Sequence, residues 1–290
     1  MNASNTTTVG FVGVGNIGRP MALRLSDAGF TVHVHDVNDD AVQACVAEGA
    51  HAAGSIAELT QASDVVAVAV LDDDQVTAVL TGDGGVLDAA DDGMTVLIHS
   101  TILPWTAQVL AQRAAERGVH LLDAPVSGGA AVARRGELSL MIGGDAEHLE
   151  GCHAVLDAEG TPAHLGPVGA GCAGKLANQL MTFCNQLGAL EAMKLARAYD
   201  IPEQAICEVV QRGTADSWIV RNWGFFDDLM HEYDRTGTPE HYRPWAKDLW
   251  DVTAVARHAD LSLPMAGLAA QLATRAFNDR LAEIEEDGQG

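Results

Sequence analysis

The chain has 290 residues, which is enough for two domains, because a single hydrophobic core seldom grows to this size. Its 48% hydrophobic and 20% charged residues predict a globular, cytoplasmic protein; we expect neither a membrane span nor a secretion signal. The formal net charge of −23 argues against nucleic acids and membranes as partners, since both require a basic surface.

Short apolar runs alternate with amphipathic stretches through the first half of the chain. Six runs rich in Val, Ile and Leu have the length of strands, and four segments between them have helical periodicity. Apolar strands separated by helices predict a doubly wound α/β domain, in which helices cover both faces of a parallel sheet. The expected strands are Thr8–Gly13, Thr31–Asp36, Val65–Val70, Thr95–His99, His120–Ala124 and Leu138–Ile142, and the expected helices are Met21–Ala28, Asp40–Glu48, Trp105–Arg117 and Asp145–Leu156.

The pattern changes at the glycine-rich segment 166–171, which favours a domain boundary. Beyond it, an unbroken helical pattern from Cys172 to Tyr199 predicts a long helix that joins two domains. We therefore expect an α/β domain over residues 1–168 and an all-α domain over residues 169–290. The other expected helices are Pro202–Arg212, Ser217–Tyr233, Pro244–His258 and Pro264–Glu285, with a loop at Thr236–Pro239.

A glycine-rich turn, Gly13-Val14-Gly15-Asn16-Ile17-Gly18, joins the first expected strand to the first expected helix. Such a G-x-G-x-x-G turn lets a pyrophosphate approach the backbone at a helix N-terminus, as in Rossmann domains. Asp36 ends the second expected strand, where a carboxylate binds ribose hydroxyls and repels a 2′-phosphate. Because residues 37–40 contain no arginine, the sequence favours NAD over NADP. The alternatives are a purely structural turn and a helix N-cap at Asp36.

Four segments occur in an order typical of one enzyme family. They are the glycine-rich turn followed by Pro20-Met21, the segment Asp123-Ala124-Pro125-Val126-Ser127-Gly128-Gly129, the segment Gly169 to Gln179, and Lys247-Asp248-Leu249. With these segments the chain resembles the β-hydroxyacid dehydrogenases, the family of 3-hydroxyisobutyrate dehydrogenase, over nearly its whole length.

The resemblance implies a role for several residues of these segments. Lys175 matches the catalytic lysine, and Asn178 lies three positions further on the same helix face. A lysine in a confined pocket can exchange a proton with the substrate hydroxyl, whereas most lysines are solvated. Ser127, Gly128 and Gly129 are implied to hold the substrate carboxylate with a hydroxyl and backbone N–H groups; the alternative is an ordinary loop.

Further positions are implied to lie around the cofactor. Lys247 comes near nicotinamide and substrate in the family, although a surface ion pair is the alternative. Ser100 and Thr101 resemble the Ser-Thr beside the nicotinamide ribose, and Leu71 corresponds to a contact with adenosine. After Leu71 this chain departs from the family with Asp72-Asp73-Asp74, which we interpret as the capped start of a helix rather than a metal site.

The expected function is therefore NAD-dependent hydride transfer between nicotinamide and a β-hydroxyacid or its semialdehyde, with Lys175 transferring the proton. An imine reductase of similar architecture is one alternative, but such enzymes typically lack the lysine and the segment 123–129. A 6-phosphogluconate dehydrogenase would need a larger helical domain, and a non-catalytic NAD-binding scaffold usually loses the lysine. The resemblance also implies a homodimer or homotetramer. The particular substrate and the preferred direction stay open.

Aromatic residues gather between positions 218 and 250, around Lys247. They suggest a pocket for a substrate larger or more apolar than 3-hydroxyisobutyrate, with Tyr242 as the preferred pocket residue. The alternative is that these rings pack between helices. The cluster comprises Trp218, Trp223, Phe225, Phe226, Tyr242, Trp245 and Trp250.

Overall fold

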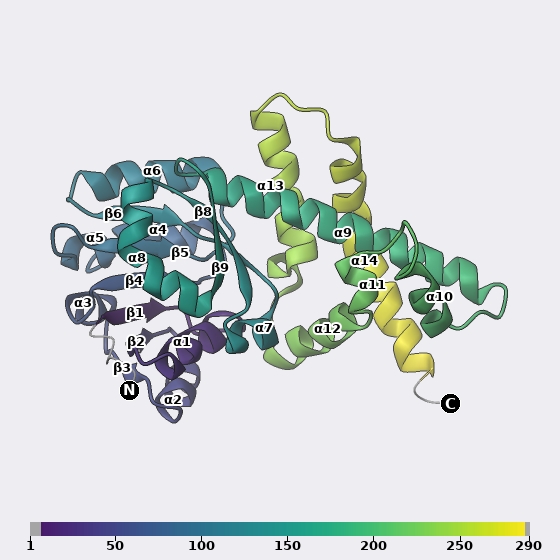
Figure 1. Cartoon of the computed structure of the whole chain (residues 1–290), viewed down its shortest axis with the longest axis horizontal. Coiled ribbons are helices and arrows are strands. Elements are labelled where there is room, and N and C mark those ends of the chain that lie inside the picture. Colours follow the sequence, from purple (N-terminus) through teal and green to yellow (C-terminus); the bar gives the residue numbers. More distant parts are fainter. Residues whose placement is uncertain (1–6, 288–290) are drawn as a thin grey trace. The chain divides into compact units, whose positions relative to one another are not determined.

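The computed structural model describes residues 7–287 (Figure 1). The chain divides into two compact units between Lys175 and Leu176, inside the long helix α9 (Ala170–Arg197). The unbroken helix expected from Cys172 to Tyr199 is thus confirmed. The domain boundary expected at residues 168–169 stays a prediction.

A nine-stranded sheet forms the centre of the N-terminal unit (Figure 1). Its first six strands are parallel in the order β3-β2-β1-β4-β5-β6, which is the doubly wound arrangement that the sequence predicts. Strand β8 follows, antiparallel to both β6 and β7, and β9 pairs in parallel with β8. The strands are β1 (Thr8–Val12), β2 (Thr31–His35), β3 (His51–Ala52), β4 (Val65–Val68), β5 (Thr95–Ile98), β6 (His120–Asp123), β7 (Val126–Ser127), β8 (Leu138–Gly143) and β9 (Gly160–Gly166).

The sheet differs from the expectation at its far edge. The expected strand at Leu138–Ile142 exists, but it is antiparallel, because an apolar run shows burial and carries no information about direction. Strands β3, β7 and β9 were not expected. Two of them have only two residues each, and β9 is mostly exposed, so none shows a long apolar run.

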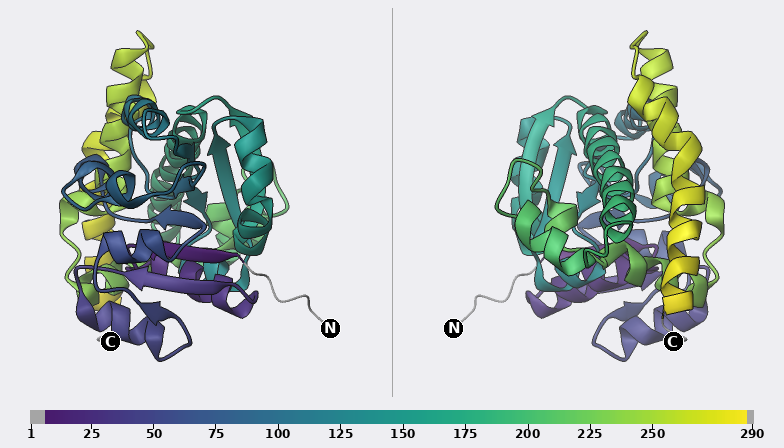
Figure 2. Two further views of the ribbon diagram at one scale, coloured as in Figure 1. Left: turned by 90° about the vertical axis from the view of Figure 1, so that its left-hand side faces the viewer. Right: turned by 90° about the vertical axis from the view of Figure 1, so that its right-hand side faces the viewer.

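Helices cover both faces of this sheet (Figure 1 and Figure 2). Successive strand residues point to opposite faces: Val65 and Ala67 join one hydrophobic core, and Val66 and Val68 join the other. The first core includes residues of α1 (Gly18–Asp27), α2 (Asp39–Val46), α7 (Ala130–Arg135) and α8 (Ala146–Glu159), and the second those of α3 (Ile56–Gln61), α4 (Asp73–Thr81), α5 (Val86–Ala89) and α6 (Pro104–Ala115).

The carboxylates that follow Leu71 begin helix α4. Asp72 is the N-cap, and its Oδ1 accepts a hydrogen bond from the backbone N–H of Gln75 at 2.8 Å. Asp73 and Asp74 lie in the first turn, where the helix dipole stabilises negative charge. The capped helix start expected from the sequence is confirmed.

The C-terminal unit is helical, as expected. One expected helix, Ser217–Tyr233, is wrong: the chain forms two helices there, because Gly224 adopts a left-handed backbone conformation with φ +98° that interrupts the helical path. Of the helices described, none is long and apolar enough to span a membrane. After α9 come α10 (Glu203–Val210), α11 (Trp218–Arg221), α12 (Phe225–Thr236), the 3₁₀ turn η1 (Glu240–Tyr242), α13 (Pro244–His258) and α14 (Pro264–Asp287).

Aromatic rings fill the core of this unit. Trp245 is 1% exposed and stacks on Phe277 with 4.4 Å between ring centroids, and Phe226 meets both rings edge-on. Trp218 packs edge-on against Phe225, with 4.9 Å between the ring centroids. For these rings, packing between helices is the observed arrangement.

Candidate active site

The glycine-rich turn lies between β1 and α1. Gly13 has φ +90°, and its N–H donates to the carbonyl of His35 at the end of β2. A Cβ on Gly13 would clash with the carbonyl of Ala69, and one on Gly18 would clash with the carbonyl of Gly13. Gly15 differs from both, because no atom of residues 7–287 outside its immediate neighbours lies within 4 Å of a Cβ placed there. Packing within the protein explains why residues 13 and 18 are glycines. The open space at Gly15 fits the approach of a diphosphate.

Asp36 holds this turn from the end of β2. Its Oδ2 accepts from the N–H of Val14 at 2.7 Å, and its Oδ1 accepts from the N–H of Asn38 at 2.9 Å. The N-cap of α2 is Asn38, whose side chain accepts from the N–H of Asp40. Asp36 is therefore not the helix cap, and its carboxylate stands beside the phosphate turn, where a ribose would lie. This arrangement fits an adenine dinucleotide.

The ends of β4 and β5 place the next expected cofactor residues. Strands β1, β4 and β5 are parallel neighbours, so the residues that follow them lie along one edge of the sheet. Ser100 is buried, and its Oγ accepts from the N–H of Val70 at 2.9 Å. Leu71 is half-exposed, and Thr101 directly follows Ser100. The structure brings these three positions to the same edge as the glycine-rich turn.

A buried ion pair lies directly behind Ser100. His99 Nε2 is 3.4 Å from Glu159 Oε1, His99 Nδ1 lies 2.8 Å from the carbonyl of Ala124, and both paired side chains are fully buried. Burial lowers the pKa of His99, but the Glu159 carboxylate and the hydrogen bond to the carbonyl of Ala124 together outweigh this effect, and the pKa is raised. The pair joins the end of β5 to the end of α8, and the hydrogen bond to Ala124 adds the end of β6.

Ser127, Gly128 and Gly129 form the turn from β7 to α7. Ser127 pairs with Ser139 on β8. Gly128 and Gly129 have φ values of +144° and +82°, a region that side-chain-bearing residues rarely adopt. The turn leads directly into the first N–H groups of a helix, which have no partner inside it. A hydroxyl beside such a turn can hold a carboxylate without any net positive charge.

Lys175 lies near the start of α9 and is 8% exposed, so it is not a solvated lysine of the usual kind. Gly174, its neighbour, would meet the side chain of Leu165 if it carried a Cβ. Asn178 follows on the same helix at i+3, a spacing that puts the two side chains on one face.

The C-terminal unit contains a chain of polar side chains that includes Asn178. Its amide donates to Gln179 Oε1 at 3.1 Å, and the buried Gln179 donates to Asp248 Oδ2 at 2.6 Å. Lys247 Nζ contacts Asp251 Oδ2 at 2.7 Å and Asp248 Oδ1 at 3.5 Å. These hydrogen-bonded side chains therefore join α9 to α13. Sequence reasoning missed Gln179 and Asp251, although Gln179 closes the third family segment.

Lys247 also lines a cavity of about 370 Å³ in the C-terminal unit. Its side chain is ion-paired but only 12% exposed, so it is not the surface pair considered from the sequence. Tyr242 is not among the lining residues; it ends η1 and packs on His241 with ring centroids 4.3 Å apart. The lining residues are Glu240, His241, Ala246, Lys247, Trp250, Asp251 and Thr274. Sequence reasoning did not single out His241, and nothing in its spacing marks it.

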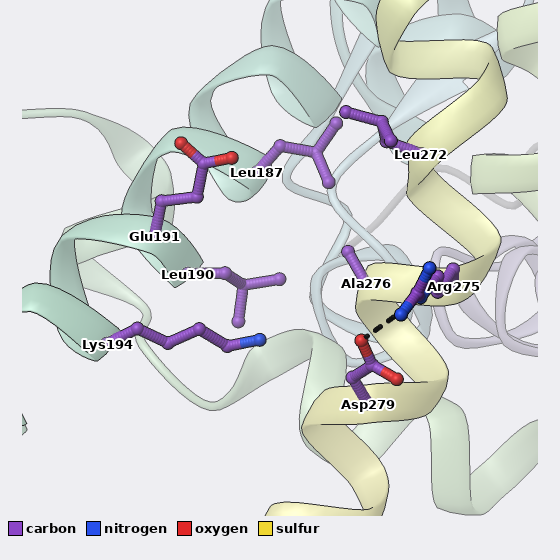
Figure 3. Close-up of a pocket in the computed structure, with 8 residues that line it drawn as sticks. All are labelled: Leu187, Leu190, Glu191, Lys194, Leu272, Arg275, Ala276 and Asp279. Carbon is purple, nitrogen blue, oxygen red and sulfur yellow. Dashed lines mark ion pairs between the residues drawn. The ribbon is translucent and has the colours of Figure 1, made fainter.

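A smaller hollow of about 210 Å³ lies between α9 and α14 (Figure 3). Lys194 reaches into it from α9, and Arg275 and Asp279 form an ion pair on α14. Lys194 follows Lys175 by 19 residues, which is about 28 Å along a helix. Along α9, this hollow therefore lies far from Lys175.

Comparisons with known proteins agree with this geometry. Residues 8–172 match the NAD-binding domain of 6-phosphogluconate dehydrogenase, and residues 169–287 match the model described as the NAD-binding part of NADP-dependent 3-hydroxyisobutyrate dehydrogenase. The chain thus contains an NAD-binding domain, and NAD is its cofactor.

Full-length relatives match over nearly the whole chain. The NAD-dependent L-serine dehydrogenase of Pseudomonas aeruginosa is 35% identical, over 91% of this chain and 90% of the relative. The 3-hydroxyisobutyrate dehydrogenase of the same organism is 33% identical, over 92% of this chain and 91% of the relative.

Among solved structures, a 3-hydroxyisobutyrate dehydrogenase of Mycobacterium tuberculosis with L-serine superposes with a TM-score of 0.79 at 27% identity, covering 96% of this chain and 94% of that one. Imine reductases match at only 18–20% identity, which shows a shared fold alone.

Proposed function

We propose that Lys175 transfers the proton in the reaction of this chain, which belongs to the 3-hydroxyisobutyrate dehydrogenase family. The chain is an NAD-dependent dehydrogenase that acts on the CH–OH group of a hydroxyacid. The observation that carries the proposal for Lys175 is its burial near the start of α9, with Asn178 on the same helix face. The imine reductase alternative has weaker support, since only the fold is shared.

Four residues of the N-terminal unit and Asn178 have roles at the substrate in this proposal. Ser127 and the backbone of Gly128 and Gly129 hold the substrate carboxylate, and Lys175 Nζ takes the hydroxyl proton during oxidation. The chemistry that bound NAD would supply here is that of a hydride acceptor for the carbinol carbon of the substrate. Asn178 orients the lysine or the substrate oxygen through its amide.

The cofactor is held at the edge of the parallel sheet. The turn from Gly13 through Gly15, Asn16 and Ile17 to Gly18 would hold the diphosphate, and Asp36 would hold the adenosine ribose. Leu71 would pack beside the adenosine, and Ser100 and Thr101 would lie beside the nicotinamide ribose. The role of Lys247 stays a prediction from the family resemblance.

The substrate that we propose is a short carboxylic acid with a hydroxyl on its β-carbon. The relatives named for L-serine and 3-hydroxyisobutyrate share this arrangement of carboxylate and hydroxyl. A pocket with room for a longer acid stays a hypothesis. Tyr242 is its candidate residue, and Trp250 lines the cavity at Lys247.

A panel of β-hydroxyacids of increasing chain length, assayed with NAD and with NADP, tests this proposal. We expect turnover of at least one acid with NAD, and no turnover of α-hydroxyacids, whose hydroxyl would lie one carbon too close to Ser127. If Tyr242 lines the pocket, Tyr242→Ala lowers kcat/KM several-fold for the longer acids. An optimum at the shortest acid that Tyr242→Ala leaves unchanged would exclude the larger pocket, and NAD binding without any turnover would exclude the enzyme.

We further propose that the chain forms a homodimer or homotetramer through the outer face of α14. Met265, Leu268 and Leu272 follow one another at i, i+3 and i+7, so they share one face of that helix, and they are 60%, 51% and 42% exposed. Exposed apolar side chains grouped on one face are typical of association surfaces. Leu272 also lines the hollow of Figure 3. A second copy of the chain would bury this face.

Leu268→Glu with Leu272→Glu should therefore lower the molar mass in solution to that of one chain, because two charges would be buried at the interface. Light scattering after size-exclusion chromatography measures this mass. Val109→Glu, which changes an exposed apolar residue of α6, is the matched control and should leave the mass unchanged. A wild-type protein with the mass of a single chain would refute the proposal.

A further inference from the structure

Asp123 ends β6 with a side chain that is fully buried. Its Oδ1 accepts a hydrogen bond from the N–H of Gly169 at 2.8 Å, and its Oδ2 accepts one from the N–H of Cys172, also at 2.8 Å. Gly169 immediately precedes α9 and Cys172 lies in its first turn, where the N–H groups have no partner within the helix. Asp123 thus caps α9 from a position 46 to 49 residues earlier in the chain.

This cap is costly for a residue whose only role would be stability. Burial raises the pKa of the Asp123 carboxyl, although the two backbone N–H groups oppose the shift. The hydrogen bonds and the positive end of the 28-residue helix offset part of the desolvation. A local Ser or Asn would cap the helix without burying a charge. What the carboxylate adds is a rigid, two-point connection between β6 and the helix.

Two glycines bring the helix into backbone contact with the sheet at the same place. A Cβ on Gly143, which pairs with Asp123 in the sheet, would lie 2.5 Å from Asp123 Oδ1 and 2.8 Å from the N of Gly171. A Cβ on Gly171 would lie 2.5 Å from the carbonyl oxygen of Asp123 and would also clash with the carbonyl of Met141. The start of α9 therefore has no freedom to move toward β6 or β8.

The connection joins the two halves of the proposed site within the N-terminal unit. Lys175 follows Cys172 by three residues, which is about one helical turn. Ser127 follows Asp123 by four residues, and the segment between them is tied to β8 by the hydrogen bond from Met141 N to Pro125 O at 3.0 Å. One carboxylate thus bonds to the helix that carries the lysine and belongs to the segment that carries the serine.

We propose that Asp123 is a positioning residue, which holds Lys175 within reach of a substrate bound at Ser127. The inference rests on the proposed function, since it needs Lys175 as the proton-transfer group. Displacement of a reacting group by about 1 Å can cost on the order of a hundredfold in rate. Asp123 acts through α9 and does not itself exchange the proton.

Asp123→Asn tests the proposal with nearly unchanged volume. The amide oxygen still accepts one N–H, but the NH₂ group faces the second N–H as a donor, so one of the two connections is lost. We expect kcat per NAD-binding site to fall by about tenfold or more, with NAD affinity within twofold of wild type. A merely structural role of Asp123 would lower the amount of folded protein. Counting the sites by NAD titration corrects kcat for such a loss.

The matched control is Asp64→Asn. Asp64 Oδ2 accepts from the N–H of Thr8 at 2.7 Å at the opposite, amino-terminal edge of the sheet, so the variant removes a similar bond far from α9. It should leave kcat unchanged.

A second pair of variants keeps the carboxylate. Gly171→Ala should push the helix away from β6 and lower kcat per site in the same way, whereas Gly188→Ala, on the same helix with open space around it, should not. Wild-type kcat per site in both Asp123→Asn and Gly171→Ala would overturn the inference, as would loss of NAD binding in both. If Lys175→Ala kept its activity, the proposed function would fail instead.

Discussion

Lys175→Ala is expected to lower kcat by at least about a hundredfold while NAD affinity stays near that of wild type. A general acid or base acts mainly in the transition state, so its removal lowers turnover more than cofactor binding. The lysine is 8% exposed, so bulk water has little access to replace it as the proton acceptor. Steady-state kinetics together with NAD titration and thermal melting separates loss of chemistry from loss of fold.

Lys194→Ala is the control for this experiment. Lys194 lies on the same helix, is half-exposed and pairs with Glu283 at 3.3 Å, so its removal should change turnover less than twofold. A loss of less than tenfold in Lys175→Ala would mean that another group carries the proton. The hydrogen-bonded side chains of Asn178, Gln179 and Asp248 would then be the first place to search.

Asp36→Ala combined with Val37→Arg is expected to reverse the cofactor preference from NAD to NADP. The first change removes a carboxylate that would repel the 2′-phosphate, and the second supplies a guanidinium that can bind it. Val37 is fully exposed, so an arginine there has room to reach the ribose. Each charge-assisted hydrogen bond gained or lost is worth about 1.5–3 kcal/mol, which corresponds to roughly a tenfold change or more in affinity.

The ratio of kcat/KM for NAD and NADP measures the reversal. Asp39→Ala removes a neighbouring exposed carboxylate at the start of α2, and this control should leave the ratio nearly unchanged. A wild-type enzyme that prefers NADP would contradict the role given to Asp36. Because Asp36 also binds the N–H of Val14, part of any loss in Asp36→Ala would come from the phosphate turn itself. The increase in kcat/KM with NADP, rather than the decrease with NAD, is therefore the decisive measurement.

The periodicity and the motifs of the chain suffice to predict several features. The alternation of apolar runs with helical stretches is enough to predict the doubly wound sheet, because burial on both faces requires continuous apolar strands. The turn from Gly13 to Gly18 and the carboxylate of Asp36 could be predicted directly, since they form a motif with a recognisable spacing; their contact depends on the pairing of β1 with β2. The long helix α9 was likewise visible, because nothing between residues 172 and 199 interrupts it.

Features that depend on distant partners become visible only when the elements are packed together. The direction of β8 depends on how the chain crosses the sheet, and the apolar run of that strand would look the same in either direction. An aspartate at a strand end gives no sign that it caps a helix 46 residues later, as Asp123 does. Nor does Gln179 show in the sequence that it will meet Asp248, 69 residues away. Periodicity records which face a residue presents, whereas hydrogen-bond partners are set by the packing of whole elements, and in this protein that packing is what places the lysine.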